Sequence, residues 1–182
     1  MGGVFWIDSS HLNSIRKALV LSTILREILE VHAPSLQLFA RQWCDCPEDC
    51  IQEVVIKLSR METIPEHWLP WVYRVVKNEA ISQRRKSNRR IKHEQTAGSS
   101  RDVWFCAVDE GEFDASDLTR ALQELDDVKR ETITAKIWGG LTFEQIAQAF
   151  ECSVSTAYER FKSGLADMKR ILNRKEVFGT GK

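Results

Sequence analysis

Three closely spaced cysteines form the first group in this chain whose residue types could support chemistry. The stretch CDCPEDC at 44–50 places Cys44, Cys46 and Cys50 among three acidic residues. Such a cluster could hold a metal ion or take part in thiol redox chemistry. A tetrahedral metal site needs about four ligands, and this C-x-C-x3-C spacing has no neighbouring histidine with familiar metal-site spacing. We therefore expect no metal and no cofactor, and buried or half-buried thiols.

The cysteines are better interpreted as the entrance of a helix. Asp45 and Glu48 have the spacing of a capping box, and Pro47 is tolerated in a first helical turn. Apolar residues then recur with helical spacing. These residues are Ile51, Val54, Val55 and Leu58.

The opposite face of the same predicted helix carries a different pattern. Its residues are Asp49, Gln52, Glu53 and Ile56. An isoleucine among acidic and polar side chains on an outward face is typical of a surface that docks another protein. A solvated acidic surface with one stray isoleucine is the alternative.

The bulk composition excludes a global electrostatic argument for nucleic-acid binding. The chain has 182 residues, 43% of them hydrophobic, and 26 basic residues balance 26 acidic ones. Any nucleic-acid interface must therefore be local. No apolar run reaches the roughly 18–20 residues of a membrane helix, and the N-terminal residues lack a secretory signal. We expect a cytoplasmic protein without membrane insertion, whose five cysteines are reduced.

Charge is sorted along the chain in a way that predicts its organisation. Basic residues dominate 71–92, where Glu79 is the single acid, and acidic residues dominate 94–117. Helix-period patterns prevail, so the predicted fold class is all-α, with two small helical domains joined by an acidic linker. The predicted boundaries are a first domain at 1–92, a linker at 93–117, a second domain at 118–174 and a tail at 175–182. The VWFC stretch at 103–106 is apolar enough to dock elsewhere.

A basic helix with aromatic residues is predicted at 67–90. Trp68, Trp71 and Tyr73 begin it, arginines and lysines end it, and valines with Ala80 form a packing stripe. Cations neutralise phosphates, and aromatic rings stack on unpaired bases, so this helix suits DNA that is being opened. The alternative is tryptophans in a core and a solvated basic helix end. The candidate DNA contacts are Trp71, Arg74, Lys77, Asn78, Arg84 and Arg85.

A helix-turn-helix is predicted at 138–165. Thr142 and Gln145 have the spacing of a capping box, and Ser153 can cap the following helix. Glu151 stands in the turn where glycine is usual, because that position takes a positive φ. The second helix would enter the major groove of DNA. It presents Ser155, Thr156, Tyr158, Glu159, Arg160 and Lys162.

Together these segments resemble a bacterial sigma-70 family sigma factor of the extracytoplasmic-function group. APSLQLFARQWC and PEDCIQEVVIKL are similar to the polymerase-binding helices of sigma region two, and WVYRVVKNEAISQRRK is similar to its promoter-opening helix. LQELDDVKRETITAKIWGGLTFEQIAQAFECSVSTAYERF is similar to region four. The resemblance covers nearly the whole chain, in the order of that family.

The resemblance implies partners and roles for particular residues. Core RNA polymerase would be bound through its β′ clamp coiled coil and β flap, with Asp49, Gln52 and Glu53 at family positions that contact the coiled coil. Asn78 matches a position that recognises the minus-ten element of promoter DNA. The loop 59–67 corresponds to one that captures a flipped base, although its proline and lack of glycine depart from many relatives. An anti-sigma factor is a further candidate partner.

Two residues depart from the family pattern, and two other functions are alternatives to a sigma factor. Tyr158 and Ser163 stand where relatives often carry basic groove-reading residues, so the minus-thirty-five sequence cannot be transferred. A stand-alone helix-turn-helix regulator, with an N-terminal sensor or dimerisation unit, is the first alternative. A thiol or metal sensor built on the cysteines is the second. No nucleophile–base pair or phosphate-cradling loop is evident, so we expect no enzymatic activity.

Overall fold

The computed structural model describes residues 9–93 and 115–178 and confirms the all-α prediction, because the described residues contain helices and turns without a strand. The first unit comprises α1 (Ser9–Glu27), the π-helical turn η1 (Ile28–His32), α2 (Ala33–Ala40), α3 (Pro47–Arg60) and α4 (Trp68–His93). The second unit comprises α5 (Ala115–Glu124), α6 (Asp127–Ile137), α7 (Phe143–Phe150) and α8 (Val154–Phe178). The VWFC stretch lies outside the described residues.

Helix α3 has the predicted core face but not the predicted N-terminal cap. Ile51, Val54 and Leu58 are buried and Val55 is half-buried. The N-cap residue is Cys46, whose side chain makes no capping hydrogen bond. A capping box from Asp45 to Glu48 would require a helix that begins one residue earlier. The predicted capping box is therefore wrong.

The helix-turn-helix of α7 and α8 has the predicted local structure. The Thr142 backbone N–H donates to Gln145 Oε1 at 2.9 Å, and the Gln145 N–H donates to Thr142 Oγ1 at 3.2 Å. Ser153 Oγ accepts from the Thr156 N–H at 3.0 Å. Glu151 ends α7 with φ 53°, the left-handed conformation expected at this turn. Both capping predictions are confirmed.

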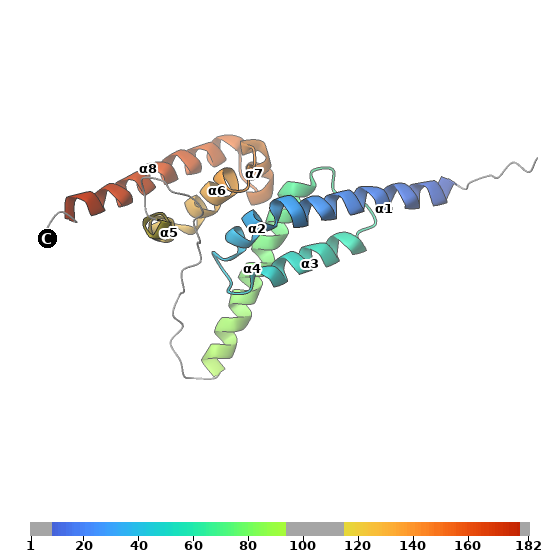
Figure 1. The fold of residues 1–182 in the computed structure, drawn as a ribbon, viewed down its shortest axis with the longest axis horizontal. Helices are drawn as coiled ribbons and strands as arrows, with labels where there is room; N and C mark the ends of the chain where they lie inside the picture. Colours follow the sequence, from blue (N-terminus) through green and yellow to red (C-terminus); the bar gives the residue numbers. More distant parts are fainter. Residues whose placement is uncertain (1–8, 94–114, 179–182) are drawn as a thin grey trace, which may run out of the picture.

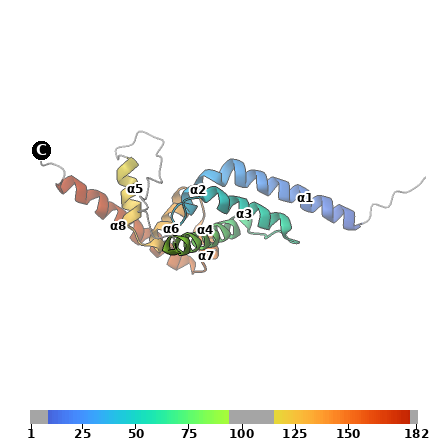
Figure 2. The ribbon, with the colours of Figure 1, turned by 90° about the horizontal axis from the view of Figure 1, so that it is seen from below.

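The two units pack against each other around a shared core. Phe39 of α2 and Phe150 of α7 stack at 5.8 Å between ring centroids, with 10° between the planes. The same buried cluster contains Tyr73 of α4 and Ile146 of α7. Figures 1 and 2 show α7 beside the first half of α4, while the second half of α4 projects away from the second unit.

A close approach at Gly139 illustrates how tightly the units fit. A side chain at this position, just after α6, would collide with the Tyr73 hydroxyl group. That hydroxyl group hydrogen bonds to Ser35 Oγ at 3.1 Å. Burial raises the pKa of Tyr73 to about 12, and the bond to Ser35 opposes this effect. Glycine is therefore required here for packing between the units.

Candidate nucleic-acid interfaces

The first half of α4 holds two predicted DNA contacts against the second unit. Arg74 Nε donates to the Ala149 carbonyl oxygen at 3.4 Å, and its Nη2 donates to the carbonyl of Gln148. Arg74 Nη1 also lies 3.3 Å from Glu151 Oε1. These acceptors stand at the C-terminal end of α7, where unpaired carbonyl groups and the helix dipole attract a cation.

Lys77 pairs with a carboxylate that is buried in the second unit. Its Nζ contacts Glu131 of α6, a residue with only 3% of its surface exposed. Nζ also lies over the rings of Phe150 and Trp43, at 5.1 and 5.9 Å from their centroids. Burial raises the pKa of the Glu131 carboxyl, and the hydrogen bond from Lys77 counteracts that rise. The pair therefore offsets the cost of burying a charge between the units.

The aromatic residues of α4 are less exposed than stacking on unpaired bases would require. Tyr73 is fully buried in the shared core, so it cannot serve as a base-stacking platform. Trp68 and Trp71 are half-buried and pack against the same core. Edge-to-face contact with His32, at 5.7 Å between centroids, further restrains Trp68. Trp71 keeps part of its surface available.

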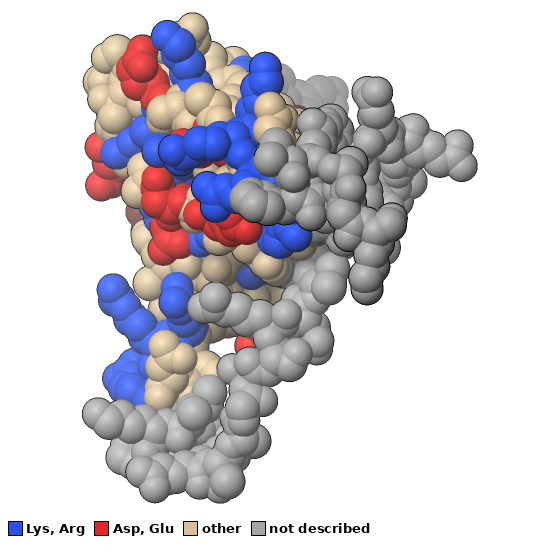
Figure 3. Space-filling view, turned by 90° about the vertical axis from the view of Figure 1, so that its left-hand side faces the viewer, with Lys and Arg blue, Asp and Glu red and all other residues tan. Residues whose placement is uncertain are grey.

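The projecting half of α4 forms an exposed basic surface. Arg84 and Arg85 are exposed there, as are Lys86 and Arg89 further along the helix, and Asn78 is exposed in the first half. Figure 3 shows Lys and Arg side chains gathered on this end of α4, whereas cations and acids are mixed over the second unit. The exposed cations of α4 are thus separated in space from Arg74 and Lys77.

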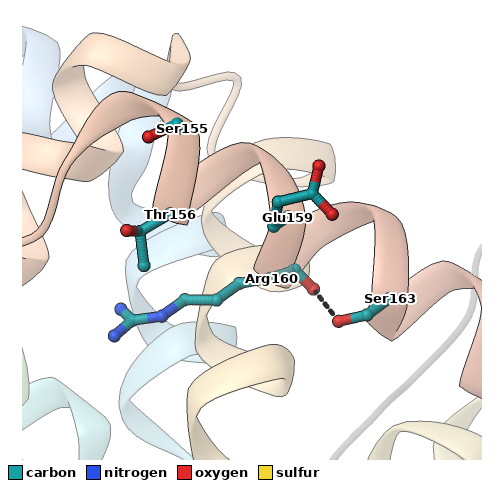
Figure 4. A pocket seen from close by; sticks show the side chains of 5 residues that line it. All are labelled: Ser155, Thr156, Glu159, Arg160 and Ser163. Carbon is teal, nitrogen blue, oxygen red and sulfur yellow. Dashed lines mark hydrogen bonds between the residues drawn. The ribbon is translucent and has the colours of Figure 1, made fainter.

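The predicted recognition face of α8 is open to solvent. Five of its six predicted residues are exposed and Arg160 is half-buried; the exposed ones are Ser155, Thr156, Tyr158, Glu159 and Lys162. Figure 4 shows Ser155, Thr156, Glu159, Arg160 and Ser163 around one hollow. The Arg160 side chain extends along this hollow and away from Glu159. The hollow therefore presents hydroxyl groups, one guanidinium group and the carboxylate of Glu159.

Contacts with α6 and α7 hold α8 in place. Lys129 Nζ lies 2.6 Å from Asp167 Oδ2, and Phe143 packs edge-on against Phe161 at 5.6 Å. The hydrogen bond between Lys129 and Asp167 raises the pKa of the lysine and lowers that of the aspartate. Tyr158 packs its ring edge-on against Phe143 at 5.4 Å. These contacts give the recognition face a rigid support.

Helix α3, which carries the predicted docking face, lies away from the second unit (Figure 1). Asp49, Gln52 and Ile56 are exposed and Glu53 is half-buried. Lys57 bridges Glu53 at 3.7 Å and Glu79 of α4 at 3.5 Å. Such partly exposed pairs contribute little stability. The face is therefore available to a partner in this arrangement.

A second hollow joins the loop after α3 to α1, a helix to which sequence analysis assigned no role. Its lining combines Ile64, Pro65 and Trp68 with Val20 and Glu27 of α1. The loop belongs to the segment compared above with a base-capturing loop. No sequence pattern connects α1 with a loop some forty residues further on.

Among the described residues, no group of three or more His, Cys, Asp and Glu side chains is placed to hold a metal ion. No helix in those same ranges is long and apolar enough to cross a membrane.

Comparisons with known proteins agree with this geometry. Residues 115–168 match the family model of sigma-70, region 4. The co-crystal structure of the sigma factor RpoE in complex with the anti-sigma factor NepR from Bartonella quintana is similar to this chain, with a TM-score of 0.63 and 25% sequence identity. The similarity covers 81% of this chain and 95% of that one. No curated protein sequence matches the chain.

Proposed function

We propose that this chain, a sigma-70 family sigma factor of the extracytoplasmic-function group, binds core RNA polymerase and directs promoter recognition, DNA opening and transcription initiation. The observation that carries the proposal is the helix-turn-helix of α7 and the first part of α8, which lies within the region 4 match. Its exposed face carries Arg160 and Lys162, which suit contacts with a duplex major groove.

The two DNA-contacting helices would have separate tasks. Helix α8 would read the upstream promoter element as a duplex. The exposed end of α4, with Arg84 and Arg85, would follow the phosphates of DNA that is being opened. Asn78 lies between this basic end and the half-buried Trp71, where it would contact a base that has left the stack.

DNA contact through Arg74 and Lys77 would require the units to separate. Both side chains are occupied by Gln148, Glu131 and neighbouring groups of the second unit. We therefore assign the packed arrangement to a form that is not engaged on a promoter. Binding of the α3 face and of the second unit to different polymerase surfaces would favour separation.

An anti-sigma protein is proposed as a second partner. The similar RpoE structure contains the anti-sigma factor NepR. A protein that binds the packed form better than the promoter-engaged form would favour the packed form, because a ligand shifts an equilibrium towards the state that it binds better.

Transcription by purified core polymerase tests the proposed function. Core polymerase without any sigma factor should initiate from specific genomic promoters only when this chain is added. A stand-alone regulator would instead bind a duplex promoter fragment tightly by itself and would not confer initiation on core polymerase. That result would overturn the proposal.

A substitution on α4 tests the opening step. Asn78→Ala should impair initiation on duplex promoters more than on templates that are already unpaired across the downstream element. Permanganate reactivity of unpaired thymines measures the opening directly. Asn88→Ala, an exposed change on the same helix, is the matched control. Equal opening by both variants would remove Asn78 from this role.

A further inference from the structure

Two of the cysteines at the entrance of α3 form a close pair that the proposed function does not use. Cys44 follows α2 and Cys50 lies in the first turn of α3, yet their Sγ atoms are 3.5 Å apart. Cys50 is fully buried and Cys44 has 8% of its surface exposed, whereas Cys46 is exposed. The pair is therefore held together by packing and is reachable by a small reagent only through Cys44.

Hydrogen bonds distinguish the two thiols of the pair. The bond from Cys50 stabilises a thiolate at Cys44 and lowers its pKa, while burial opposes this effect. The same bond, followed by burial, raises the pKa of Cys50. Burial and the nearby acids also raise the pKa of the exposed Cys46. Since the thiolate is the nucleophilic form, Cys44 is the favoured attacking group.

We propose that Cys44 and Cys50 are a redox modification site, at which a hydroperoxide converts the two thiols into a reversible disulfide. Cys44 attacks the hydroperoxide, whose O–O bond breaks, so that Cys44 becomes a sulfenic acid and water or an alcohol leaves. Cys50 then attacks the Cys44 sulfur, which forms the S–S bond and releases water. The two thiols lose two electrons and two protons, and the hydroperoxide is reduced.

The disulfide would act on the proposed docking face of α3. A disulfide bond is about 2.05 Å long, whereas the thiol sulfurs are 3.5 Å apart. The two sulfur atoms must therefore approach each other when the bond forms, which would draw the first turn of α3 towards the end of α2. Asp49, the neighbour of Cys50, belongs to that turn. We expect oxidation to weaken core-polymerase binding by about 5- to 150-fold, the usual range of coupling between two sites. This expectation rests on the proposed function.

Peptide mapping of the full chain tests the modification. The reduced protein is treated with hydrogen peroxide, digested under non-reducing conditions and analysed by mass spectrometry. The expected product links Cys44 to Cys50, forms equally in Cys46→Ser, and disappears on treatment with dithiothreitol. A link that involves Cys46, or no link at all, would overturn the proposal.

Trapping the intermediate tests the order of the steps. In Cys50→Ala the sulfenic acid has no resolving thiol, so dimedone should label Cys44. Labelling of Cys46 instead would overturn the assignment of the attacking group. If Cys50→Ala does not fold, dimedone competition in Cys46→Ser replaces it, because the label should then be captured at Cys44 at the expense of the disulfide.

Polymerase affinity before and after oxidation tests the coupling. Cys46→Ser should bind core polymerase normally when reduced and more weakly when oxidised, whereas peroxide should leave the affinity of Cys44→Ser unchanged. A disulfide with unchanged affinity would overturn the coupling. Failure of the reduced protein to bind core polymerase would instead contradict the proposed function, so the two outcomes are distinguishable.

Discussion

The two helices predicted to contact DNA carry similar side chains but are presented differently. Helix α8 offers exposed hydroxyl groups and cations, including Lys162, supported from behind by α6 and α7. Helix α4 offers exposed cations only in its projecting half, because Arg74 and Lys77 contact the second unit. The difference shows that an outward-facing position on a helix becomes an available surface only where no other unit covers it.

Breaking the ion pair of Lys77 and Glu131 between the two units should have the largest effect on stability. Lys77→Ala leaves Glu131 buried without its closest cation, which typically costs about 3–5 kcal/mol for a buried pair. The cost should lie near the lower end, because Arg160 also favours the charged carboxylate. Amide hydrogen exchange in α7 should increase as the units separate.

A matched substitution controls this experiment. Lys57→Ala removes partly exposed pairs with Glu53 and Glu79 and should cost only about 0–1 kcal/mol. Equal exchange in the two variants would mean that the Lys77 pair does not hold the units together.

A substitution on the open face of α8 should have an intermediate effect, on DNA binding. Arg160→Ala should weaken binding of the polymerase complex to a duplex upstream element by about 1–3 kcal/mol if the guanidinium group contacts a base. Lys169→Ala, on an exposed position further along α8, is the control. Affinity should be measured at several salt concentrations, since the loss of a phosphate contact would make binding less dependent on salt. Identical behaviour of both variants would exclude this face from DNA contact.

Substitutions on the predicted docking face of α3 should have a smaller effect, on core-polymerase binding. Reversing the charge at Asp49 or Glu53 should weaken core-polymerase binding by about 0–1 kcal/mol if the residue forms an exposed pair at the rim of the interface. A loss of about 2–5 kcal/mol would place it in a desolvated centre instead. Glu30→Lys, at an exposed position of η1, controls for net charge. Unchanged affinity for Asp49 and Glu53 variants would exclude the face.

The smallest effect on stability is expected for the ion pair between Lys129 of α6 and Asp167 of α8. The pKa of Asp167 is lowered from 3.8 by its hydrogen bond to Lys129, so its contribution to stability is complete above that value and is lost as the pH falls through the lowered pKa. Asp167→Asn should therefore reduce the free energy of unfolding at neutral pH and match the wild type in strong acid. A difference between the two proteins that does not change with pH would contradict this.

Local patterns in the sequence determined the helices and much of their surface. The capping box of Thr142 and Gln145, the left-handed Glu151 and the buried stripe of α3 all depend on residues a few positions apart. Such interactions are set by helix periodicity and backbone conformation. The exposure of the predicted recognition face of α8 follows from the same periodicity, which is why it could be predicted.

Tertiary structure alone decided which of these surfaces are covered. Arg74 meets Ala149 and Lys77 meets Glu131, across more than fifty residues of sequence. Tyr73 became part of the shared core rather than a stacking surface. No short-range pattern encodes these contacts, because they depend on how two amphipathic units bury their remaining apolar surfaces against each other. The sulfur contact of Cys44 and Cys50 likewise required the fold of the turn before α3, since spacing alone does not determine the distance between two side chains.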